Sequence, residues 1–590
     1  MAKETGQVDD RITALAIIGA GAAWVTLFTG AYLSTVLTGQ SPIRAALLPP
    51  IAALSTPWAP EQAWRQPVGP PLLYWGATVT VAVLVISGGE LLRRQFTPSQ
   101  RQAKGCATPR QAAAVAGTRA LEKRGKALRP SLASAKPAEL GYLLGTADRA
   151  ECFASVEDSI VVLGPPRSGK GLHLIIPSIL DAPGPVLTTS TRPDNLTVTM
   201  ARRAARGPVA VFDPQRLAPG ITSATRWSPI RGCENPHIAM VRAKALTANI
   251  ASGTTDSTFW QASAEQAVRC LLHAAALRGC TSSDLYRWSL SSTQAREAVM
   301  ILGTHPEAAE SWHQALDAII SADPRQRDSI WAMVTIAFSA LADPKVLDAV
   351  SPGPGEGFDP EDFLRRNGTI YLLGTSTGVS ATAGLVGAFV EDVVEAARRL
   401  AARSPVSRLD PPLSLILDEA ANYPLPSLPS LMSDGGGSGL STIVVLQSLA
   451  QARAVWGEHA ASAIWDAAIV KTVLGGGSNA RDLQDLSTLI GQRDEHTTSS
   501  SRGPDGRRST STTTGKVPIL EPAQLRTLPF GTGILLMKSA PPISLTLRAW
   551  TDRKDASSLS ADRDTLEAQI RAAASGSERP QRTSAVTEAL

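Results

Sequence analysis

The chain has 590 residues, and 57 lysines and arginines against 52 aspartates and glutamates give it a formal net charge of +5. This length allows two to four domains with a large core, and the mild positive charge permits an anionic partner without identifying one. The five cysteines include no CxxC pair, and the seven histidines include no HExxH motif. We therefore expect reduced thiols in a cytosolic part and no structural metal site.

Two uncharged stretches near the amino terminus predict membrane spans. Residues 12–37 are long enough to cross a bilayer with some tilt, and residues 72–89 form a second, shorter run. A cleaved signal peptide is the alternative for the first run, but that run is long and its flank is mixed in charge. A buried core hairpin is the alternative for the second run. We predict a two-helix transmembrane hairpin over residues 1–94, with an external loop at 39–70.

A basic flank follows the second span. Between Arg93 and Arg129 there are ten arginines and lysines and a single acid, Glu122. By the positive-inside rule this flank and the amino terminus lie in the cytoplasm. Contact with lipid headgroups is favoured over a nucleic-acid site, although both could use this charge. Residues 95–145 carry no strand pattern, and we interpret them as a basic linker or stalk.

The strongest chemical motif lies between an apolar, β-branched run at 160–163 and a helix-compatible segment. Strand, glycine-bounded loop and helix form the context of a phosphate-binding loop, in which backbone N–H groups and a lysine meet phosphate oxygens. A chance glycine turn is the alternative, and this context disfavours it. One position departs from the general pattern, because a glycine stands where a Ser or Thr hydroxyl normally holds Mg²⁺. The residues of the loop are Gly164, Pro165, Pro166, Arg167, Ser168, Gly169, Lys170 and Gly171.

Short apolar runs alternate with helical patterns through much of the remaining chain. They predict an α/β fold with a mainly parallel sheet, divided between residues 146–255 and 353–552. The interval 256–352 lacks strand runs and predicts an all-helical insertion. Pro177 should kink or shorten the helix that follows the glycine loop. Composition further predicts a mobile loop at 497–515 and a disordered tail at 553–590 with at most one short helix.

Two further strand ends carry polar side chains. Residues 413–417 form an apolar run that ends in Asp418 and Glu419. At the carboxyl edge of a sheet, the aspartate would lie near a nucleotide-bound Mg²⁺ and the glutamate could polarise an attacking water. Another apolar strand ends in Gln447, whose amide could sense the γ-phosphate. Each strand end alone is weak evidence, and a solvated strand end is the ordinary alternative.

The chain resembles the TraG/TraD-like coupling ATPases of type IV secretion and conjugation, which are RecA-like P-loop proteins. The stretches that carry the resemblance include GPPRSGKGLHLIIPSIL, VLTTSTRPDNL, VAVFDPQRL and ILDEAANYPLPSLPSLMSDGGGSGLSTIVVLQS. Members of the family commonly share the glycine after the lysine and the proline in the following helix. The resemblance implies that Lys170 contacts phosphate, Asp418 associates with the metal, Glu419 activates water and Gln447 is the sensor.

The same resemblance implies ATP and Mg²⁺ as cofactors and a bacterial inner-membrane ATPase that is a hexamer when active. Its expected partners are single-stranded DNA with a relaxase, and the components of a type IV secretion channel. The helical insertion would correspond to the family's all-α domain. The chain departs from the family in its glycine run, where Gly436 and Ser438 stand in place of arginines linked to a trans-acting finger. An FtsK-like DNA translocase and a nucleotide-binding membrane receptor without hydrolysis remain as alternatives.

Overall fold

The computed structural model describes residues 21, 23–44, 49–96, 104–221, 224–248, 250, 257–375, 382–502 and 508–577. The chain divides into two compact units, Met1–Gln102 and Ala103–Leu590.

The first unit is helical. An apolar helix at Ala23–Leu37 is followed by α2 (Pro49–Ala52), α3 (Pro60–Trp64) and α4 (Pro71–Phe96). The first helix and α4 approach so closely that a Cβ on Gly30 would lie 2.5 Å from the Cα of Thr78. In the described part of the chain, only the stretch Pro71–Gly88 of α4 is long and apolar enough to cross a membrane. The expected first span lies partly outside the described residues, so the two-span hairpin stays a prediction.

The second unit is organised around an 11-stranded sheet in its described residues, in the order β2-β1-β13-β12-β9-β3-β8-β7-β4-β6-β5. The strands from β9 to β5 are all parallel, whereas β12 (Thr532–Met537), β13, β1 and β2 extend the sheet with antiparallel pairings. This arrangement confirms the mainly parallel α/β prediction. The parallel strands are β3 (Ile160–Leu163), β4 (Val186–Ser190), β5 (Val209–Phe212), β6 (Thr369–Leu373), β7 (Leu413–Leu417), β8 (Leu440–Leu446) and β9 (Val470–Leu474).

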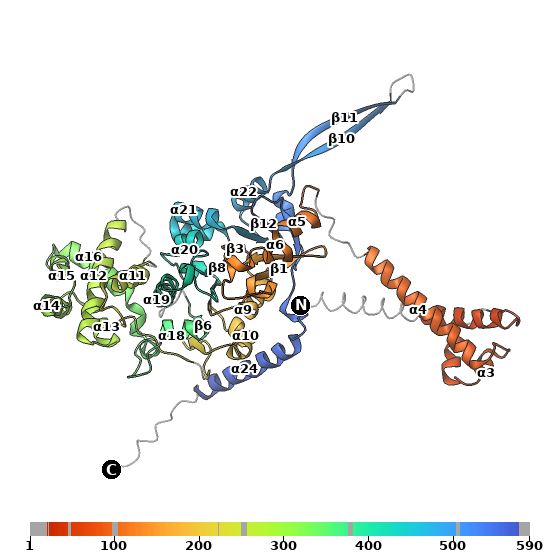
Figure 1. Cartoon of the computed structure of the whole chain (residues 1–590), viewed down its shortest axis with the longest axis horizontal. Helices are drawn as coiled ribbons and strands as arrows, with labels where there is room; N and C mark the ends of the chain where they lie inside the picture. Colours follow the sequence, from red (N-terminus) through yellow and green to blue (C-terminus); the bar gives the residue numbers. More distant parts are fainter. Residues whose placement is uncertain are drawn as a thin grey trace, which may run out of the picture. The chain divides into compact units, whose positions relative to one another are not determined.

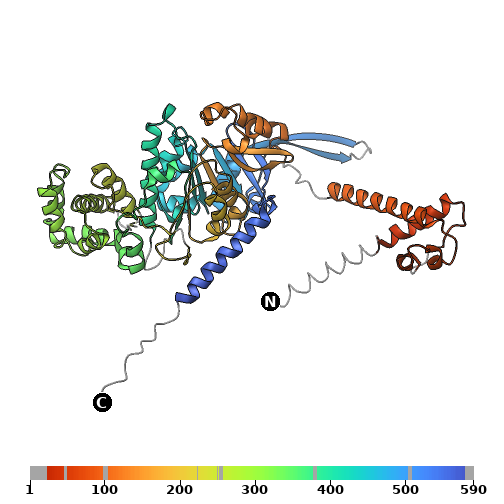
Figure 2. The same cartoon turned by 60° about the horizontal axis from the view of Figure 1, so that its bottom comes forward.

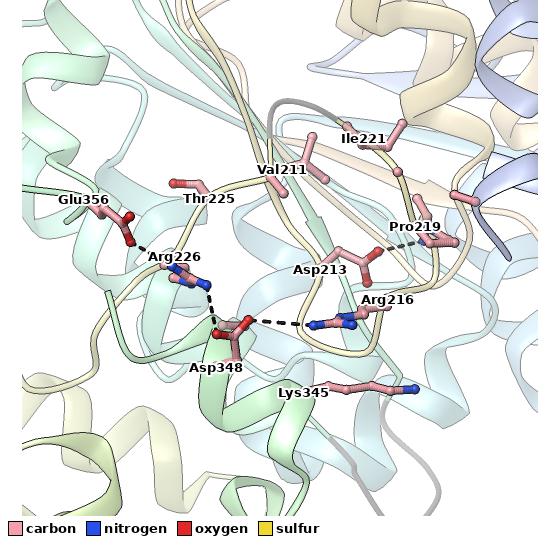
Figure 3. A pocket seen from close by; sticks show the side chains of 15 residues that line it. Val211, Asp213, Arg216, Pro219, Ile221, Thr225, Arg226, Lys345, Asp348 and Glu356 are labelled. Carbon is pink, nitrogen blue, oxygen red and sulfur yellow. Dashed lines mark hydrogen bonds and ion pairs between the residues drawn. The ribbon is translucent and has the colours of Figure 1, made fainter. Parts of the chain in front are cut away.

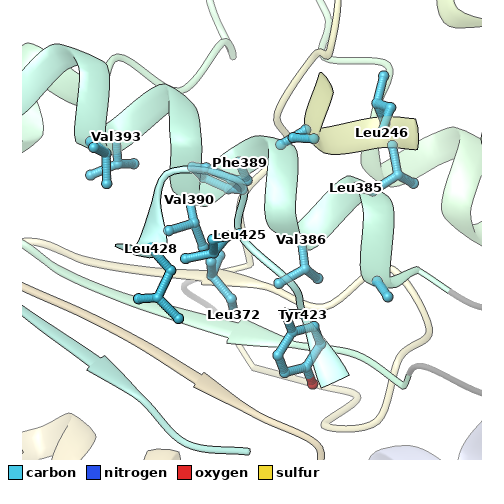
Figure 4. Close-up of a cluster of buried hydrophobic side chains, with 14 of the residues drawn as sticks. Leu246, Leu372, Leu385, Val386, Phe389, Val390, Val393, Tyr423, Leu425 and Leu428 are labelled. Atoms are coloured by element: carbon cyan, nitrogen blue, oxygen red, sulfur yellow. The ribbon is translucent and has the colours of Figure 1, made fainter. Parts of the chain in front are cut away.

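The central strands are buried along their whole length, because helices cover both faces of a parallel sheet. One covering helix is α19 (Ala383–Ala402), whose buried face is shown in Figure 4. Val386, Phe389 and Val390 project from this helix toward Leu372 of β6 and toward Tyr423, which follows β7. The resulting core fixes the carboxyl ends of the strands relative to one another.

The helix after β3 begins with a wide π turn, Gly171–Ile175, and continues as α9 (Ile176–Asp181). Pro177 stands in the first turn of α9. The missing N–H of a proline is tolerated at the start of a regular helix. The expected disturbance therefore takes the form of a wide turn before the proline.

The helical interval inserts between β5 and β6 and lies at one end of the unit (Figures 1 and 2). It contains α12 (Ser257–Arg278), α13 (Ser282–Leu290), α14 (Arg296–Thr304), α15 (Trp312–Ile320), α16 (Pro324–Ala337) and α17 (Pro344–Ala349). The helices α11 (Pro236–Thr247) and α18 (Pro360–Arg365) flank it.

Four features differ from the sequence-based expectations. The supposed stalk contains α5 (Pro109–Ala116), α6 (Thr118–Glu122) and α8 (Pro137–Leu140), and it packs into the core of the second unit through Ala112, Ala116, Leu121 and Leu140. Residues 104–145, the described part of the expected stalk that lies in the second unit, are therefore not a stalk. The prediction also missed the antiparallel strands β1 (Gly141–Ala147), β2 (Ala150–Ser155) and β13 (Ile543–Thr546). β1 contains Gly141 and Gly145, β2 contains Glu151, and β13 has only four residues, so none of them presents a long continuous apolar run.

The expected mobile loop at 497–515 is instead a β-hairpin in its described residues. The strands β10 (Gln492–Arg502) and β11 (Arg508–Pro518) pair antiparallel and project from the body of the unit (Figure 1). Their sequence is rich in Ser and Thr, and β-branched threonines favour extended backbone without requiring a buried face. Composition alone therefore gave the wrong prediction here.

The carboxyl-terminal tail also departs from expectation. Residues Ala556–Ser577 form a 22-residue helix, α24, which lies beside α10 (Asp194–Ala204) (Figure 1). Leu559 is fully buried, and Leu566 and Ile570 pack against a cluster that contains Leu196. This apolar spacing places the three side chains on one helix face and explains why the segment is ordered.

Candidate nucleotide-binding site

The parallel strands place the predicted chemical groups at one edge of the sheet. The strand β3 leads into the glycine loop, β7 ends before Asp418, and β8 lies between them and ends before Gln447. Because these strands are parallel, their carboxyl ends share an edge. Gly164 N–H donates to the Leu446 carbonyl at 2.9 Å, which joins the start of the loop to the end of β8.

The glycine loop has a backbone that its glycines require. Gly169 has a φ of +85°, and a Cβ there would lie 2.7 Å from Nδ1 of His173 and 2.8 Å from Cε2 of Phe530. Gly171 is different, because a Cβ there would meet nothing within 4 Å. The space beside Gly171 is part of a cavity of about 590 Å³. A hydroxyl is absent at this position although there is room for one.

Lys170 faces the two predicted acids across this cavity. Its Nζ lies 3.9 Å from Oδ1 of Asp418 and 4.0 Å from Oε1 of Glu419. Among the described residues, neither Nζ of Lys170 nor Oδ1 of Asp418 has a hydrogen-bond partner, although both atoms are buried. Oγ of Ser168 in the loop is also buried without a partner. Unpaired buried polar groups are costly, so this set points to a ligand that would satisfy them.

The environment of Asp418 makes its carboxyl group a weaker acid than an exposed aspartate when no ligand is bound. Burial raises the pKa of Asp418 to about 6, and the nearby Glu419 contributes to this rise, while Lys170 opposes it. Asn195 at the start of α10 lies 3.5 Å from Oδ2 of Asp418, and Thr189 donates to the Asp418 carbonyl at 3.0 Å. A cation in this cavity would therefore find a carboxylate whose Oδ2 faces Asn195 and whose Oδ1 is still free to coordinate.

Glu419 is held in one orientation by two donors. Oγ1 of Thr191 lies 2.7 Å, and Nδ2 of Asn422 lies 3.0 Å, from Oε2 of Glu419. The backbone of Glu419 is left-handed, with a φ of 50°, an uncommon conformation for a residue that is not glycine. Oε1 is thereby left on the side of Lys170. A fixed carboxylate with one free oxygen is suited to accept a proton from a water.

The structure brings most of the predicted site residues together. Pro166, Arg167, Gly169, Lys170, Gly171, Asp418 and Glu419 all line the cavity. Gln447 does not line it, although its strand lies directly between β3 and β7. Its proposed role as a sensor therefore rests on the strand end alone.

The cavity also has walls that sequence analysis did not anticipate. Ser190, Thr191 and Asn195 contribute from the end of β4 and the start of α10, and Trp550, Arg563 and Glu567 contribute from the carboxyl-terminal region. The stretch TTSTRPDN after an apolar strand was visible in the sequence as a polar strand end. Nothing in the local pattern around Arg563 indicated that it would reach the cavity.

Gly436, in the glycine run that departs from the family pattern, has no room for a side chain. A Cβ on Gly436 would lie 2.0 Å from the carbonyl oxygen of Glu157. A side chain at this position would require the backbone to shift. The neighbouring Gly437 has ordinary space, with its nearest atom at 3.4 Å.

One family model matches the part of the chain that contains Asp418 and Glu419. Residues 412–530, which include β7, β8 and β9, match the family described as the TraM recognition site of TraD and TraG. The chain resembles the TraG/TraD-like coupling proteins. A comparison with curated protein sequences finds no match.

Solved structures with the same fold include the bacterial conjugative coupling protein TrwBdeltaN70 in its unbound monoclinic form. That match has a TM-score of 0.53 and 16% identity, and it covers 74% of this chain and 92% of TrwBdeltaN70. TrwB in complex with a non-hydrolysable ATP analogue matches with a TM-score of 0.51 and 15% identity, over 74% of this chain and 93% of the other. The second unit therefore has the RecA-like fold of these coupling proteins.

A second cavity of about 660 Å³ lies where the helical insertion joins the sheet (Figure 3). Arg226 pairs there with Asp348 at 2.8 Å and with Glu356 at 2.7 Å. Asp213, at the end of β5, accepts backbone hydrogen bonds from Leu217 and Ala218. These charges are largely paired with one another, so they stabilise the root of the insertion and leave no clear ligand chemistry.

Proposed function

We propose that this protein is a membrane-anchored ATPase that couples DNA, with or without bound protein, to a type IV secretion channel and drives conjugative transfer by ATP hydrolysis. The observation that carries the proposal is the facing pair of Lys170 and Asp418. Each side chain has a buried polar atom without a hydrogen-bond partner, and both lie at the carboxyl edge of a RecA-like sheet. This arrangement of charges fits a nucleoside triphosphate and its cation.

In this proposal each site residue has a separate role. Lys170 would contact the outer phosphates, the loop N–H groups would surround them, and Asp418 would hold Mg²⁺. When bound, Mg²⁺ would neutralise charge on the phosphates. Because Thr191 and Asn422 fix one oxygen of Glu419, the other oxygen is available to take a proton from the attacking water. Gln447 would report the state of the γ-phosphate to β8.

The remaining parts of the proposal concern assembly and location. The apolar part of α4 supports an anchor in the bacterial inner membrane, with the second unit in the cytoplasm. A RecA-like site is normally completed by a neighbouring subunit, so we propose a homo-hexamer in the active state. Single-stranded DNA with a relaxase, together with secretion-channel components, would be the partners.

The experiment that tests this function is the ATPase rate per subunit of the full chain in detergent, measured against protein concentration with and without single-stranded DNA. We expect a slow basal rate that rises with protein concentration and with DNA, because both bring subunits together and so complete the site that neighbouring subunits share. DNA stimulation should be stronger at low salt than at high salt. Lys170→Ala serves as the inactive control. A rate that is concentration-independent and indifferent to DNA would contradict the proposal.

A membrane receptor that binds nucleotide without hydrolysing it is the second candidate. The steric closure at Gly436 favours it, because an arginine in the glycine run cannot be placed there without a backbone shift. Trans-acting arginines are worth about 10³–10⁵ in turnover where they act. Tight ATP binding with no turnover at any concentration, with or without DNA, would support the receptor.

A further inference from the structure

The carboxyl-terminal helix α24 is fastened to the helices that border the nucleotide cavity. Just before the helix, Arg553 pairs with both carboxylate oxygens of Asp181 at 2.8 Å, and Asp555 pairs with Arg202 of α10 at 2.9 Å. Further along, Leu566 and Ile570 pack on the cluster that contains Leu196. These contacts hold α24 at both its beginning and its middle.

One residue of this helix reaches the cavity in which Lys170 lies. The guanidinium carbon of Arg563 lies 5.9 Å from the centre of the Trp550 ring, and both residues line the cavity. Glu567, one turn later, lines it as well and lies 3.8 Å from Nε of Arg563. Nη2 and Nε of Arg563 also donate to Oδ1 of Asp564 at 2.7 and 3.0 Å, and the Arg563 side chain remains 36% exposed.

The wall beneath Arg563 is apolar. Trp550 is buried in a cluster with Ile176, Leu180, Val198 and Leu559, and Leu172 packs against this cluster. Leu172, Ile176 and Val198 also line the cavity. The cavity thus combines the charged set of Lys170, Asp418 and Glu419 with an apolar wall that carries a planar cation. A nucleoside triphosphate has the same two parts, namely charged phosphates and an aromatic base.

We infer that α24 supplies the nucleoside-binding wall of the site, with the Arg563 guanidinium, supported by Trp550, stacking on the base of the bound nucleotide. This inference rests on the proposed function and deepens it. A guanidinium is planar and weakly hydrated, so it stacks on aromatic rings more effectively than an ammonium. Stacking does not depend on the edge of the base, so ATP and GTP should both use this wall.

The test compares ATP with inorganic tripolyphosphate, which has the phosphates and lacks the nucleoside. Dissociation constants of both ligands are measured by calorimetry on the full chain in detergent, for the wild type and for Arg563→Ala. We expect Arg563→Ala to bind ATP about tenfold more weakly, within the range of a partly desolvated cation–ring contact. Binding of tripolyphosphate should be unchanged.

Three further variants make the outcome decisive. Arg571→Ala is the matched control on the same helix, since its side chain is 69% exposed and does not line the cavity; it should bind ATP as the wild type does. Arg563→Lys keeps the charge and removes the planar group, so it should lose ATP affinity as Arg563→Ala does, and it decides the question if the alanine variant does not fold. Lys170→Ala should lose both ligands.

Results that contradict the nucleoside assignment differ from results that contradict the proposed function. Unchanged ATP affinity in Arg563→Ala, or an equal loss of ATP and tripolyphosphate, would overturn the nucleoside assignment while leaving the ATPase proposal in place. Wild-type ATP affinity in Arg563→Lys would show that charge alone matters and would equally overturn stacking. If the wild type bound neither ligand, the proposed function itself would be wrong.

Discussion

Nζ of Lys170 lies 3.9 Å from Oδ1 of Asp418, and neither atom has a hydrogen-bond partner among the residues that the structure describes. The two groups attract each other but are too far apart for a hydrogen bond. This separation is what a site needs if phosphate oxygens and a cation are to enter between the charges. The loop and the acid come from strands that β8 separates, so the spacing is set by the sheet.

Removing the lysine tests the phosphate contact. Lys170→Ala should weaken ATP binding at least about tenfold, because a charge-assisted hydrogen bond contributes about 1.5–3 kcal/mol. Calorimetric titration of the full chain with ATP measures this loss. The control is Lys345→Ala, an exposed lysine that does not line this cavity. Wild-type affinity in Lys170→Ala would contradict the assignment of the phosphate-binding loop.

Glu419 should act on the chemical step and not on binding. Glu419→Gln keeps the size of the side chain, and its amide oxygen can still accept hydrogen bonds from Thr191 and Asn422. The amide cannot act as a base that takes a proton from water. We expect ATP affinity close to that of the wild type and turnover lower by about 10²-fold or more, the usual effect of losing a general base. Steady-state ATPase kinetics together with equilibrium binding separate the two effects. A parallel loss of affinity would indicate that Glu419 holds the nucleotide or the loop.

The raised pKa of Asp418 predicts a pH-dependent stability. Burial raises the pKa of Asp418 to about 6 in the folded protein, whereas an aspartate in the unfolded chain has a pKa of about 3.9. Between these values the folded state binds more protons, so this group makes the free energy of unfolding fall as pH rises, by about 1.4 kcal/mol for each unit of pKa difference. Asp418→Asn should therefore gain melting temperature relative to the wild type more strongly at pH 7.5 than at pH 4.5.

The measurement uses thermal melting in buffer without nucleotide or Mg²⁺, because either ligand would change the charge balance at Asp418. Asp485→Asn is the control, since the Asp485 side chain is 57% exposed. Its difference from the wild type should not change with pH in the same way. A pH-independent difference for Asp418→Asn would show that Lys170 keeps Asp418 ionised over the whole interval.

The glycine run offers a matched pair of substitutions. Gly436→Ala should destabilise the protein by about 1–3 kcal/mol, the usual cost of overpacking, because its Cβ would lie 2.0 Å from the Glu157 carbonyl oxygen. Gly437→Ala should be nearly neutral, because its nearest neighbour is at 3.4 Å. Melting temperatures of the two variants decide the comparison. Equal stability would mean that the backbone beside Glu157 can move aside, and an arginine could then be accommodated in the run.

Membrane topology can be tested independently of the nucleotide site. If both predicted spans cross the membrane, a reporter placed near Gln62 should be active outside the cytoplasm, and one near Arg110 should be active inside. The basic residues after α4 set this orientation. At each position, one fusion carries a reporter that is active only in the cytoplasm, and a second fusion carries a reporter that is active only outside it. Both positions on the same side of the membrane would rule out the hairpin.

The sequence by itself determined the parallel core and the chemical motifs. The runs at Ile160–Leu163 and Leu413–Leu417 are continuously apolar, because strands covered on both faces have no polar side. The loop with Lys170 and the acids Asp418 and Glu419 follow directly from those runs, and their meeting at one edge follows from parallel strand direction. These features are local, so a local pattern suffices to predict them.

Only the tertiary structure decided the parts that depend on distant contacts. The sequence around Arg563 is polar and helical, and its place in the cavity arises from the packing of Leu559, Leu566 and Ile570 on distant elements. The hairpin of β10 and β11 likewise depends on strand pairing, which composition does not encode. Closure at Gly436 comes from the Glu157 carbonyl, far away in the chain. Such contacts are set by how the elements pack together, and no short window of sequence contains them.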